Sequence, residues 1–378
     1  MQNYFIEKIL PWLFSSNEKC ACDLDVSDGL YIYGAGDLGA LALEYCEACD
    51  IQIKGFLDRA RTEPMASKLV GKYRVYRPDS VENALDKNIP VAVAIATSPY
   101  APIAEQLHAL NWKSVTPFYN LSSSPQIGHP LRNGWCLGEV SDYEKEMVEF
   151  VCNHWADETS WLHYEAFIAW HRNNTEIELN LAPITPSERY AFPKLLKALQ
   201  DRQRVFVDVG SHHGESIARM NLMGIGFREY HSFEPDPASR SVLQVRKKAL
   251  VPNDAAFVVY ADVLSDKVGS SNFQVGLGYC SQIWKNGAES RQTNVLDTFN
   301  LNPNFLKIHT EGSEAKIIKG ALETIERSKP VIAYSVYHRR EGFFSDIAEA
   351  MALISGYQWF FRLHSFQGTG AFVYAIPN

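Results

Sequence analysis

The sequence predicts an α/β protein in which two similar parallel-sheet folds follow one another, and three observations support this class. The chain has 378 residues, of which 46% are hydrophobic, and this length favours two domains that each bury a core. Short apolar runs alternate with helical stretches in two separate series, at residues 30–119 and 204–378. The segment between them is rich in helix formers. Strands separated by helices imply parallel sheets.

The first domain is expected over residues 1–120. Its short apolar runs predict strands, and its longer periodic stretches predict helices. The strands are expected at Leu30–Tyr33, Ile53–Leu57, Val91–Ala96 and Ser114–Thr116, and the helices at Leu38–Cys49, Ser80–Ala84 and Ala101–Leu110.

A helical connector is expected over residues 121–200. It opens with Leu-Ser-Ser-Ser-Pro, a loop composition, and continues with helix formers and aromatic residues over Val140–Asn173. Trp155, Trp161, Phe167 and Trp170 fit either a hydrophobic core or the seam of a homodimer.

The second domain is expected over residues 201–378, with seven strands. A short loop with two glycines joins the last two strands, which indicates an antiparallel hairpin at the end of a parallel sheet. The strands are expected at Val205–Val209, Glu229–Phe233, Ala256–Tyr260, Phe305–Ile308, Val331–Val336, Trp359–Leu363 and Ala371–Ile376. Helices are expected from Glu215, from Ala238, over Glu314–Ile325 and over Phe344–Ile354.

Charge and composition exclude several classes of protein. The chain carries 36 Lys and Arg against 44 Asp and Glu, a net charge of −8, which argues against binding nucleic acid or anionic lipid through bulk charge. The most apolar run, Ile89–Ala96, is far shorter than the roughly 20 residues that span a bilayer. The start of the chain resembles no signal peptide, and the seven cysteines fit reduced thiols, so we expect a cytoplasmic protein.

Small and acidic residues follow the first three strands of the second domain. Asp208, Gly210, Ser211 and Gly214 lie between a strand and a helix, where small residues let the backbone approach a ligand and a helix offers free N–H groups. Glu234 ends the next strand, where a carboxylate suits a ribose, and Asp262 follows the third. We expect a nucleoside-type cofactor here. The alternative is an ordinary tight turn in which Asp236 and Pro237 start a helix.

Five motifs of the second half resemble the FkbM-type family of S-adenosylmethionine-dependent methyltransferases, over about residues 186–378. They are Asp208-Val-Gly-Ser-His-His-Gly-Glu-Ser, Phe233-Glu-Pro-Asp-Pro, Asn294-Val-Leu-Asp-Thr-Phe, Leu306-Lys-Ile-His-Thr-Glu-Gly-Ser-Glu with Lys319-Gly-Ala, and Ile332-Ala-Tyr-Ser-Val-Tyr-His. The resemblance implies a class I methyltransferase domain with a seven-stranded sheet and S-adenosylmethionine near Asp208, Gly210 and Gly214. It implies methylation of a hydroxyl on a sugar, glycan precursor or natural product.

An alcohol acceptor needs a base, and His309, Glu311 and His338 are the candidates, since each is predicted at a strand end. The family pattern at the fourth strand is Lys-Ile-Asp-x-Glu-Gly, and this chain has His309 in place of the Asp. Glu311 fits equally the first turn of a helix, and His338 a solvated turn. Because no acidic trio has a recognisable spacing, we expect no metal.

A dinucleotide-type fingerprint lies in the first domain. Gly34, Gly36 and Gly39 fit G-x-G-x-x-G after a strand and before a helix, and Asp58 lies 19 positions after Gly39. The region resembles Rossmann-like nucleotide-binding domains, so a nucleotide or nucleotide-sugar is expected here, or a purely structural domain. The pairs Cys20/Cys22 and Cys46/Cys49 fit packing better than a zinc site.

The leading hypothesis is therefore a methyltransferase with a small-molecule or saccharide acceptor. Two alternatives remain open at this point. One is a nucleotide-binding sensor or scaffold whose methyltransferase domain has lapsed, and the other is an NAD-dependent oxidoreductase that uses the first domain.

Overall fold

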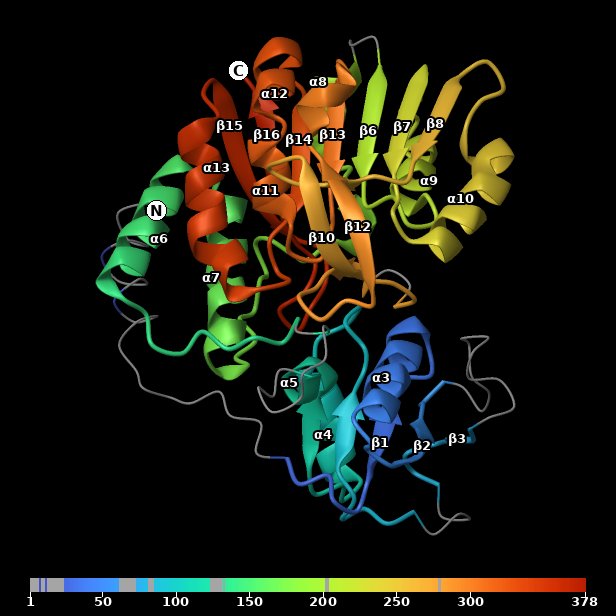
Figure 1. Ribbon diagram of the computed structural model, residues 1–378. Coiled ribbons are helices and arrows are strands. Elements are labelled where there is room, and N and C mark those ends of the chain that lie inside the picture. Colours follow the sequence, from blue (N-terminus) through green and yellow to red (C-terminus); the bar gives the residue numbers. More distant parts are fainter. Residues whose placement is uncertain are drawn as a thin grey trace.

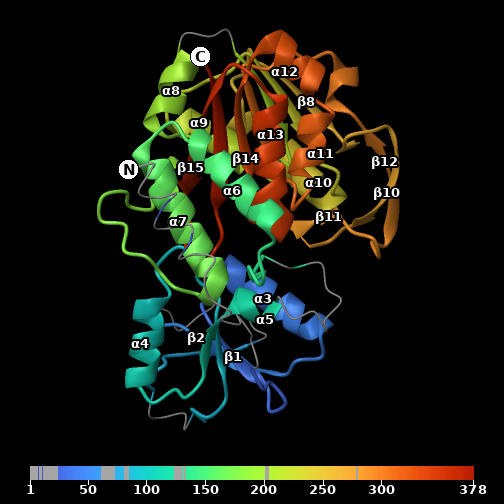
Figure 2. The ribbon, with the colours of Figure 1, turned by 90° about the vertical axis from the view of Figure 1, so that its left-hand side faces the viewer.

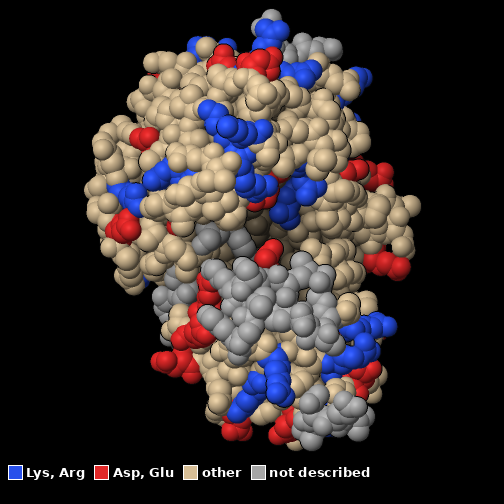
Figure 3. Space-filling view, turned by 90° about the vertical axis from the view of Figure 1, so that its right-hand side faces the viewer, with Lys and Arg blue, Asp and Glu red and all other residues tan. Residues whose placement is uncertain are grey.

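The computed structural model describes residues 7, 11, 24–60, 73–80, 85–122, 131, 133–200, 204–277 and 280–378. Within these ranges it contains a five-stranded sheet in the N-terminal part, a seven-stranded sheet in the C-terminal part and a four-stranded sheet beside the latter (Figure 1). The predicted α/β class with two parallel-sheet folds is confirmed. The surface is hollowed where the two parts meet (Figure 3).

The N-terminal sheet is parallel, with strand order β3-β2-β1-β4-β5. Its two sides bury separate apolar clusters. The expected strands and two of the expected helices are present, whereas most of the helix expected at Ser80–Ala84 lies outside the described residues. The elements are β1 (Leu30–Tyr33), α3 (Asp37–Ala48), β2 (Ile53–Leu57), β3 (Val75–Tyr76), β4 (Val91–Val93), α4 (Ala101–Ala109), β5 (Val115–Pro117) and α5 (Phe118–Ser122).

The C-terminal sheet has the order β15-β16-β14-β13-β6-β7-β8, and its last strand, β16, is antiparallel to both neighbours. All seven predicted strands are present. They are β6 (Val205–Val209), β7 (Glu229–Phe233), β8 (Ala256–Tyr260), β13 (Phe305–Ile308), β14 (Val331–Ser335), β15 (Tyr357–Leu363) and β16 (Ala371–Pro377). Its helical segments are α9 (Glu215–Leu222), α10 (Pro237–Leu250), η4 (Leu296–Phe299), α11 (Glu314–Lys319), α12 (Leu322–Ser328), η5 (Gly342–Asp346) and α13 (Ile347–Leu353).

The helical segment expected as a connector packs into the same hydrophobic core as the C-terminal sheet. It forms α6 (Asp142–His154), α7 (Glu158–Asn173), η2 (Pro186–Glu188) and α8 (Pro193–Gln200), with α6 and α7 lying along α13 and β15 (Figure 2). Ser141 and Glu144 form a capping box that starts α6. Trp155, Phe167 and Trp170 are buried in the chain itself.

The four-stranded sheet, with order β11-β10-β12-β9, was not predicted. It comprises β9 (Val263–Leu264), β10 (Gly269–Gln274), β11 (Gln282–Ile283) and β12 (Glu289–Asn294). Its two longer strands are mostly polar, and only one residue of each is fully buried, so they give no apolar run to recognise.

Three segments tie the two parts together. The loop before β11 places Cys280 in the apolar cluster of the N-terminal part. The Phe366 N–H donates to the Ala96 carbonyl at 2.8 Å, and the Glu176 carboxylate accepts from the backbone N–H of Tyr100. These contacts join the carboxyl edge of the N-terminal sheet to the other half of the chain.

One expectation about the cysteines is wrong. Cys136 is disulfide-bonded, whereas Cys46, Cys49, Cys152 and Cys280 are free, so the thiols are not all reduced. Cys46 is buried in the N-terminal core, as expected for packing. Cys20 and Cys22 lie outside the described residues. None of the helices in the described ranges has the length and apolar content that crossing a bilayer requires.

Candidate active site

The turn after β6 requires glycine at Gly210. Its φ is +74°, and an added Cβ would lie 1.9 Å from the His309 carbonyl oxygen, so no other residue fits without moving the backbone. Gly214 has φ +83° and precedes α9, where a Cβ would meet Leu250. The backbone of this turn therefore lies directly against the end of β13.

The Asp208 carboxylate points into the protein interior, not toward a ligand. Its Oδ1 lies 2.8 Å from the Lys307 ammonium, and its Oδ2 accepts from the Ser216 hydroxyl at 2.5 Å. The Lys307 ammonium also donates to the Gly210 carbonyl at 2.6 Å. Burial opposes the charge on Lys307, but the neighbouring Asp208 outweighs it and raises the pKa of the ammonium. These two residues thus hold the glycine turn in place.

A pocket opens at the carboxyl ends of β6, β7 and β13. Among the residues expected at the cofactor, Gly210, Glu234 and Asp262 line it, and so do His309 and Glu311. The pocket is covered by Phe273, Ser281 and Ile283 from the four-stranded sheet and the loop before β11. Asp208, Ser211 and Gly214 are not among its lining residues; the Ser211 hydroxyl donates to the Asp208 carbonyl.

Glu234 is fixed by its own backbone surroundings. Its two carboxylate oxygens accept from the N–H groups of His212, at 2.6 Å, and Asp236, at 2.9 Å. Burial raises the pKa of the Glu234 carboxyl. On the third strand end, Asp262 accepts from the Asn294 side chain at 2.5 Å. Two positioned carboxylates therefore face the same pocket.

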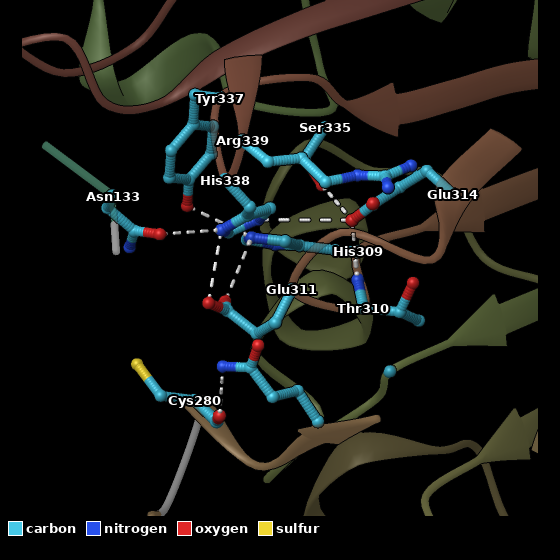
Figure 4. Close-up of polar contacts among 12 residues, drawn as sticks. Asn133, Cys280, His309, Thr310, Glu311, Glu314, Ser335, Tyr337, His338 and Arg339 are labelled. Atoms are coloured by element: carbon cyan, nitrogen blue, oxygen red, sulfur yellow. Dashed lines mark hydrogen bonds and ion pairs between the residues drawn. The ribbon is translucent and has the colours of Figure 1, made fainter. Parts of the chain in front are cut away.

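The three candidate bases lie together in one cluster (Figure 4). The His338 Nδ1 lies 3.1 Å from Glu311 Oε2, and the His309 Nε2 lies 3.9 Å from Glu311 Oε1. His309 and Glu311 follow β13 and His338 follows β14, so two adjacent parallel strands deliver all three side chains. Glu311 has a φ of +57°, a conformation that a side chain other than glycine adopts only at an energetic cost.

A second set of polar side chains surrounds this cluster and was not predicted. The Tyr337 and Tyr190 hydroxyls each lie 3.0 Å from a ring nitrogen of His309. Asn133 Oδ1 lies 3.1 Å from His338 Nδ1, and the Glu314 carboxylate lies 3.9 Å from His338 Nε2. Asn133 and Tyr190 come from distant parts of the chain, so no local spacing identifies them.

The pKa values of the two histidines shift in opposite directions. Burial, with the positive charges of His338 and Lys307, lowers the pKa of His309 well below its usual range. Burial also opposes charge on His338, but the Glu311 carboxylate outweighs it and raises the pKa of that imidazole. His309 is therefore neutral near pH 7. The cluster holds a neutral imidazole, a carboxylate and a more basic imidazole.

The comparisons with known proteins point to the same half of the chain. A family model described as Methyltransferase FkbM domain matches residues 208–361. These residues form an FkbM methyltransferase domain.

A solved FkbM methyltransferase from Methylobacillus flagellatus KT is similar to the whole chain, with a TM-score of 0.60 and 17% identity over 99% of this chain and 96% of that one. At this identity the likeness shows the fold. A putative O-methyltransferase from Klebsiella pneumoniae matches with a TM-score of 0.32 and 13% identity, over 59% of this chain and 91% of that one. The comparison with curated proteins gave no match.

The glycine loop of the N-terminal part lies outside the FkbM domain. An added Cβ at Gly39 would lie 2.0 Å from the Gly34 carbonyl oxygen, whereas Gly36 has open space beside it. The Asp58 carboxylate accepts from the Ala35 N–H at 3.3 Å, so it lies against the glycine loop. The Gln367 side chain of the other half donates to the Ile95 carbonyl after β4, so part of this sheet edge is used for contact between the halves.

Proposed function

We propose that this protein is an S-adenosylmethionine-dependent methyltransferase that methylates a hydroxyl group of a sugar, glycan precursor or natural product. The observation that carries the proposal is that Gly210, Glu234, Asp262, His309 and Glu311 all line one pocket. It combines carboxylates suited to a nucleoside with proton-accepting groups, at the sheet edge where α/β folds bind ligands.

The residues of the pocket fit the cofactor. Gly210 presents backbone where a side chain would obstruct, and Glu234 lines the pocket, where its carboxylate would accept from ribose hydroxyls. Asp262, which follows the next strand, β8, suits a purine amine. When bound there, the cofactor would supply an electrophilic methyl group.

The chain's own part in the reaction is to orient the acceptor hydroxyl and take up its proton. Glu311 lines the pocket and is backed by His338, so a proton that reaches the Glu311 carboxylate remains within a hydrogen-bonded pair. His309 is neutral and both of its ring nitrogens are held by tyrosine hydroxyls, so its ring would give the acceptor a fixed, uncharged wall of the pocket. The saccharide nature of the acceptor rests on the family resemblance.

The first test is isothermal titration with S-adenosylhomocysteine. Wild type should bind in the micromolar range, and Glu234→Ala should abolish binding. Glu229→Ala is the matched control, because Glu229 is exposed at the opposite end of the same strand. No binding by wild type would overturn the proposal. Binding of NAD alone would instead favour the oxidoreductase, and uptake of a nucleotide by the first domain alone would favour a sensor or scaffold.

A further inference from the structure

His309, Glu311 and His338 have the composition and spacing of a metal-binding triad. Each offers one ligand atom, and these atoms all lie within 4.8 Å of one another. The measured separations from the Glu311 carboxylate are 3.1 Å to His338 and 3.9 Å to His309. Two ligand atoms that share an ion at about 2.1 Å lie at most about 4.2 Å apart. Both separations from Glu311 are already shorter than this limit, so at most a small approach of the two histidine nitrogens, which lie within 4.8 Å, is needed.

Two further oxygen atoms lie next to the ring nitrogens that would bind the ion. The Asn133 side-chain oxygen lies 3.1 Å from His338 Nδ1, and the Tyr337 hydroxyl lies 3.0 Å from His309 Nε2. Both are neutral oxygen donors beside the two ligating nitrogens. The side chains of Glu311 and His338 are almost fully buried, which excludes the water that would compete for an ion at an exposed cluster.

The outer side of the His338 imidazole offers the carboxylate that a metal-bound histidine requires. Such histidines direct their second ring nitrogen to a carboxylate or another polar group. The His338 Nε2 is buried, has no hydrogen-bond partner among the described residues, and lies 3.9 Å from Glu314. Glu314 is itself held by the Ser335 hydroxyl, at 2.7 Å, and the Thr310 N–H, at 2.8 Å. An ion on Nδ1 would orient the ring and leave Nε2–H for this carboxylate.

We propose that His309, Glu311 and His338 bind one divalent transition-metal ion, of the class of Zn²⁺, Mn²⁺, Co²⁺ or Fe²⁺. Two imidazoles with one carboxylate suit these ions, whereas Mg²⁺ and Ca²⁺ prefer oxygen ligands alone. His309 and Glu311 line the pocket, so an open coordination position faces it. An ion held there would lower the pKa of a hydroxyl that binds at that position. Binding of the ion does not depend on the proposed function. Only the action of the ion on an acceptor hydroxyl rests on the proposed methyl transfer. The proposal departs from the expectation of no metal.

The test is titration of the purified, chelator-treated full chain with Co²⁺, followed by visible absorption and calorimetry. Wild type should take up one Co²⁺ per chain with d–d bands of a nitrogen and oxygen site. Glu311→Gln keeps the shape of the side chain and should weaken Co²⁺ binding about 100-fold or more, and Glu314→Gln about 10-fold. His309→Asn serves as the second ligand variant if Glu311→Gln does not fold.

A second cluster provides the control. His212, His213 and Glu215 also group three ligand atoms, but at the surface. The double variant His213→Ala/Glu215→Ala should leave the buried Co²⁺ spectrum unchanged. Loss of the ion in this variant, or retention of full affinity in both Glu311→Gln and His309→Asn, would overturn the proposal. Titration of the same samples with S-adenosylhomocysteine separates the two proposals, since Co²⁺ binding without nucleoside binding would overturn only the proposed function.

Discussion

The Lys307 ammonium lies 2.8 Å from the Asp208 carboxylate, across the neighbouring strands β13 and β6. Both residues are at most 3% exposed. The same ammonium bonds to the Gly210 carbonyl, so a buried ion pair sets the backbone that lines the pocket. Its role is to shape the turn, while Glu234 and Asp262 line the pocket.

Asp208→Ala should therefore act on stability. It leaves a buried ammonium without its counter-ion, and we expect the free energy of unfolding to fall by about 3–5 kcal/mol. Urea unfolding measures this loss. The double variant Asp208→Leu/Lys307→Met should lose much less, because no charge remains buried. Asp142→Ala, which breaks an exposed pair with Lys145, should cost under about 1 kcal/mol. Equal losses for the two single variants would contradict the buried-pair account.

The sequence predicts all seven strands of the C-terminal sheet and four of the five strands of the N-terminal sheet, most of them as short apolar runs. It misses β3, which has only two residues. The sequence also predicts that Glu234, His309 and Glu311 lie at the same edge of the C-terminal sheet, because the carboxyl ends of parallel strands lie at one edge. It assigns no role to Lys307, although a lysine between two buried apolar residues is itself a signal for a buried partner. The ionic partner of Asp208 could have been inferred from that position.

Other features depend on the tertiary structure and leave no local signal. Asn133 reaches His338 across 205 positions of sequence, and Tyr190 reaches His309 across 119. The hairpin of β10 and β12 is polar along most of its length, so periodicity does not reveal it. The position of Cys280 in the core of the other half likewise follows from how the two parts dock.

The contact between the halves should depend on Gln367. Gln367 is buried and its backbone has a φ of +56°. Its side-chain amide donates to the Ile95 carbonyl at the edge of the N-terminal sheet. Gln367→Ala leaves that carbonyl without its donor, so we expect faster hydrogen exchange in residues 93–101 and 363–371. Gln358→Ala, at an exposed position of β15, should leave exchange in both segments unchanged. Unaltered exchange in Gln367→Ala would show that the other contacts suffice.

Acid should destabilise the protein through His163. Its Nδ1 accepts from the Leu363 N–H at 2.9 Å and its Nε2 donates to the Ala182 carbonyl at 2.8 Å, so only the neutral ring satisfies both. Burial lowers the pKa of His163 to about 4. Because the unfolded chain protonates near the usual 6.5, this stability is present above pH 6.5 and is lost as the pH falls toward 4, by about 3 kcal/mol.

His163→Gln tests this assignment. Gln keeps a donor for Ala182 but leaves the Leu363 N–H without its acceptor, so at pH 7.5 it should cost about 1–3 kcal/mol of unfolding free energy. Gln does not titrate, so the difference from wild type should shrink between pH 6.5 and pH 4. Urea unfolding at several pH values measures it. A difference that is constant with pH would assign the acid sensitivity to other groups.

Gly210 and Gly224 offer a matched pair for the pocket turn. Their φ values are +74° and +75°, but an added Cβ meets the His309 carbonyl at 1.9 Å in the first case and nothing within 4 Å in the second. Gly224→Ala should cost about 1–2 kcal/mol for its backbone conformation alone. Gly210→Ala must also displace the end of β13, so it should cost at least about 2 kcal/mol more and should weaken S-adenosylhomocysteine binding, which Gly224→Ala leaves intact. Equal unfolding free energies for the two variants would show that the turn can move away from the end of β13 at no energetic cost. The contact between Gly210 and the His309 carbonyl could not then set the shape of the pocket.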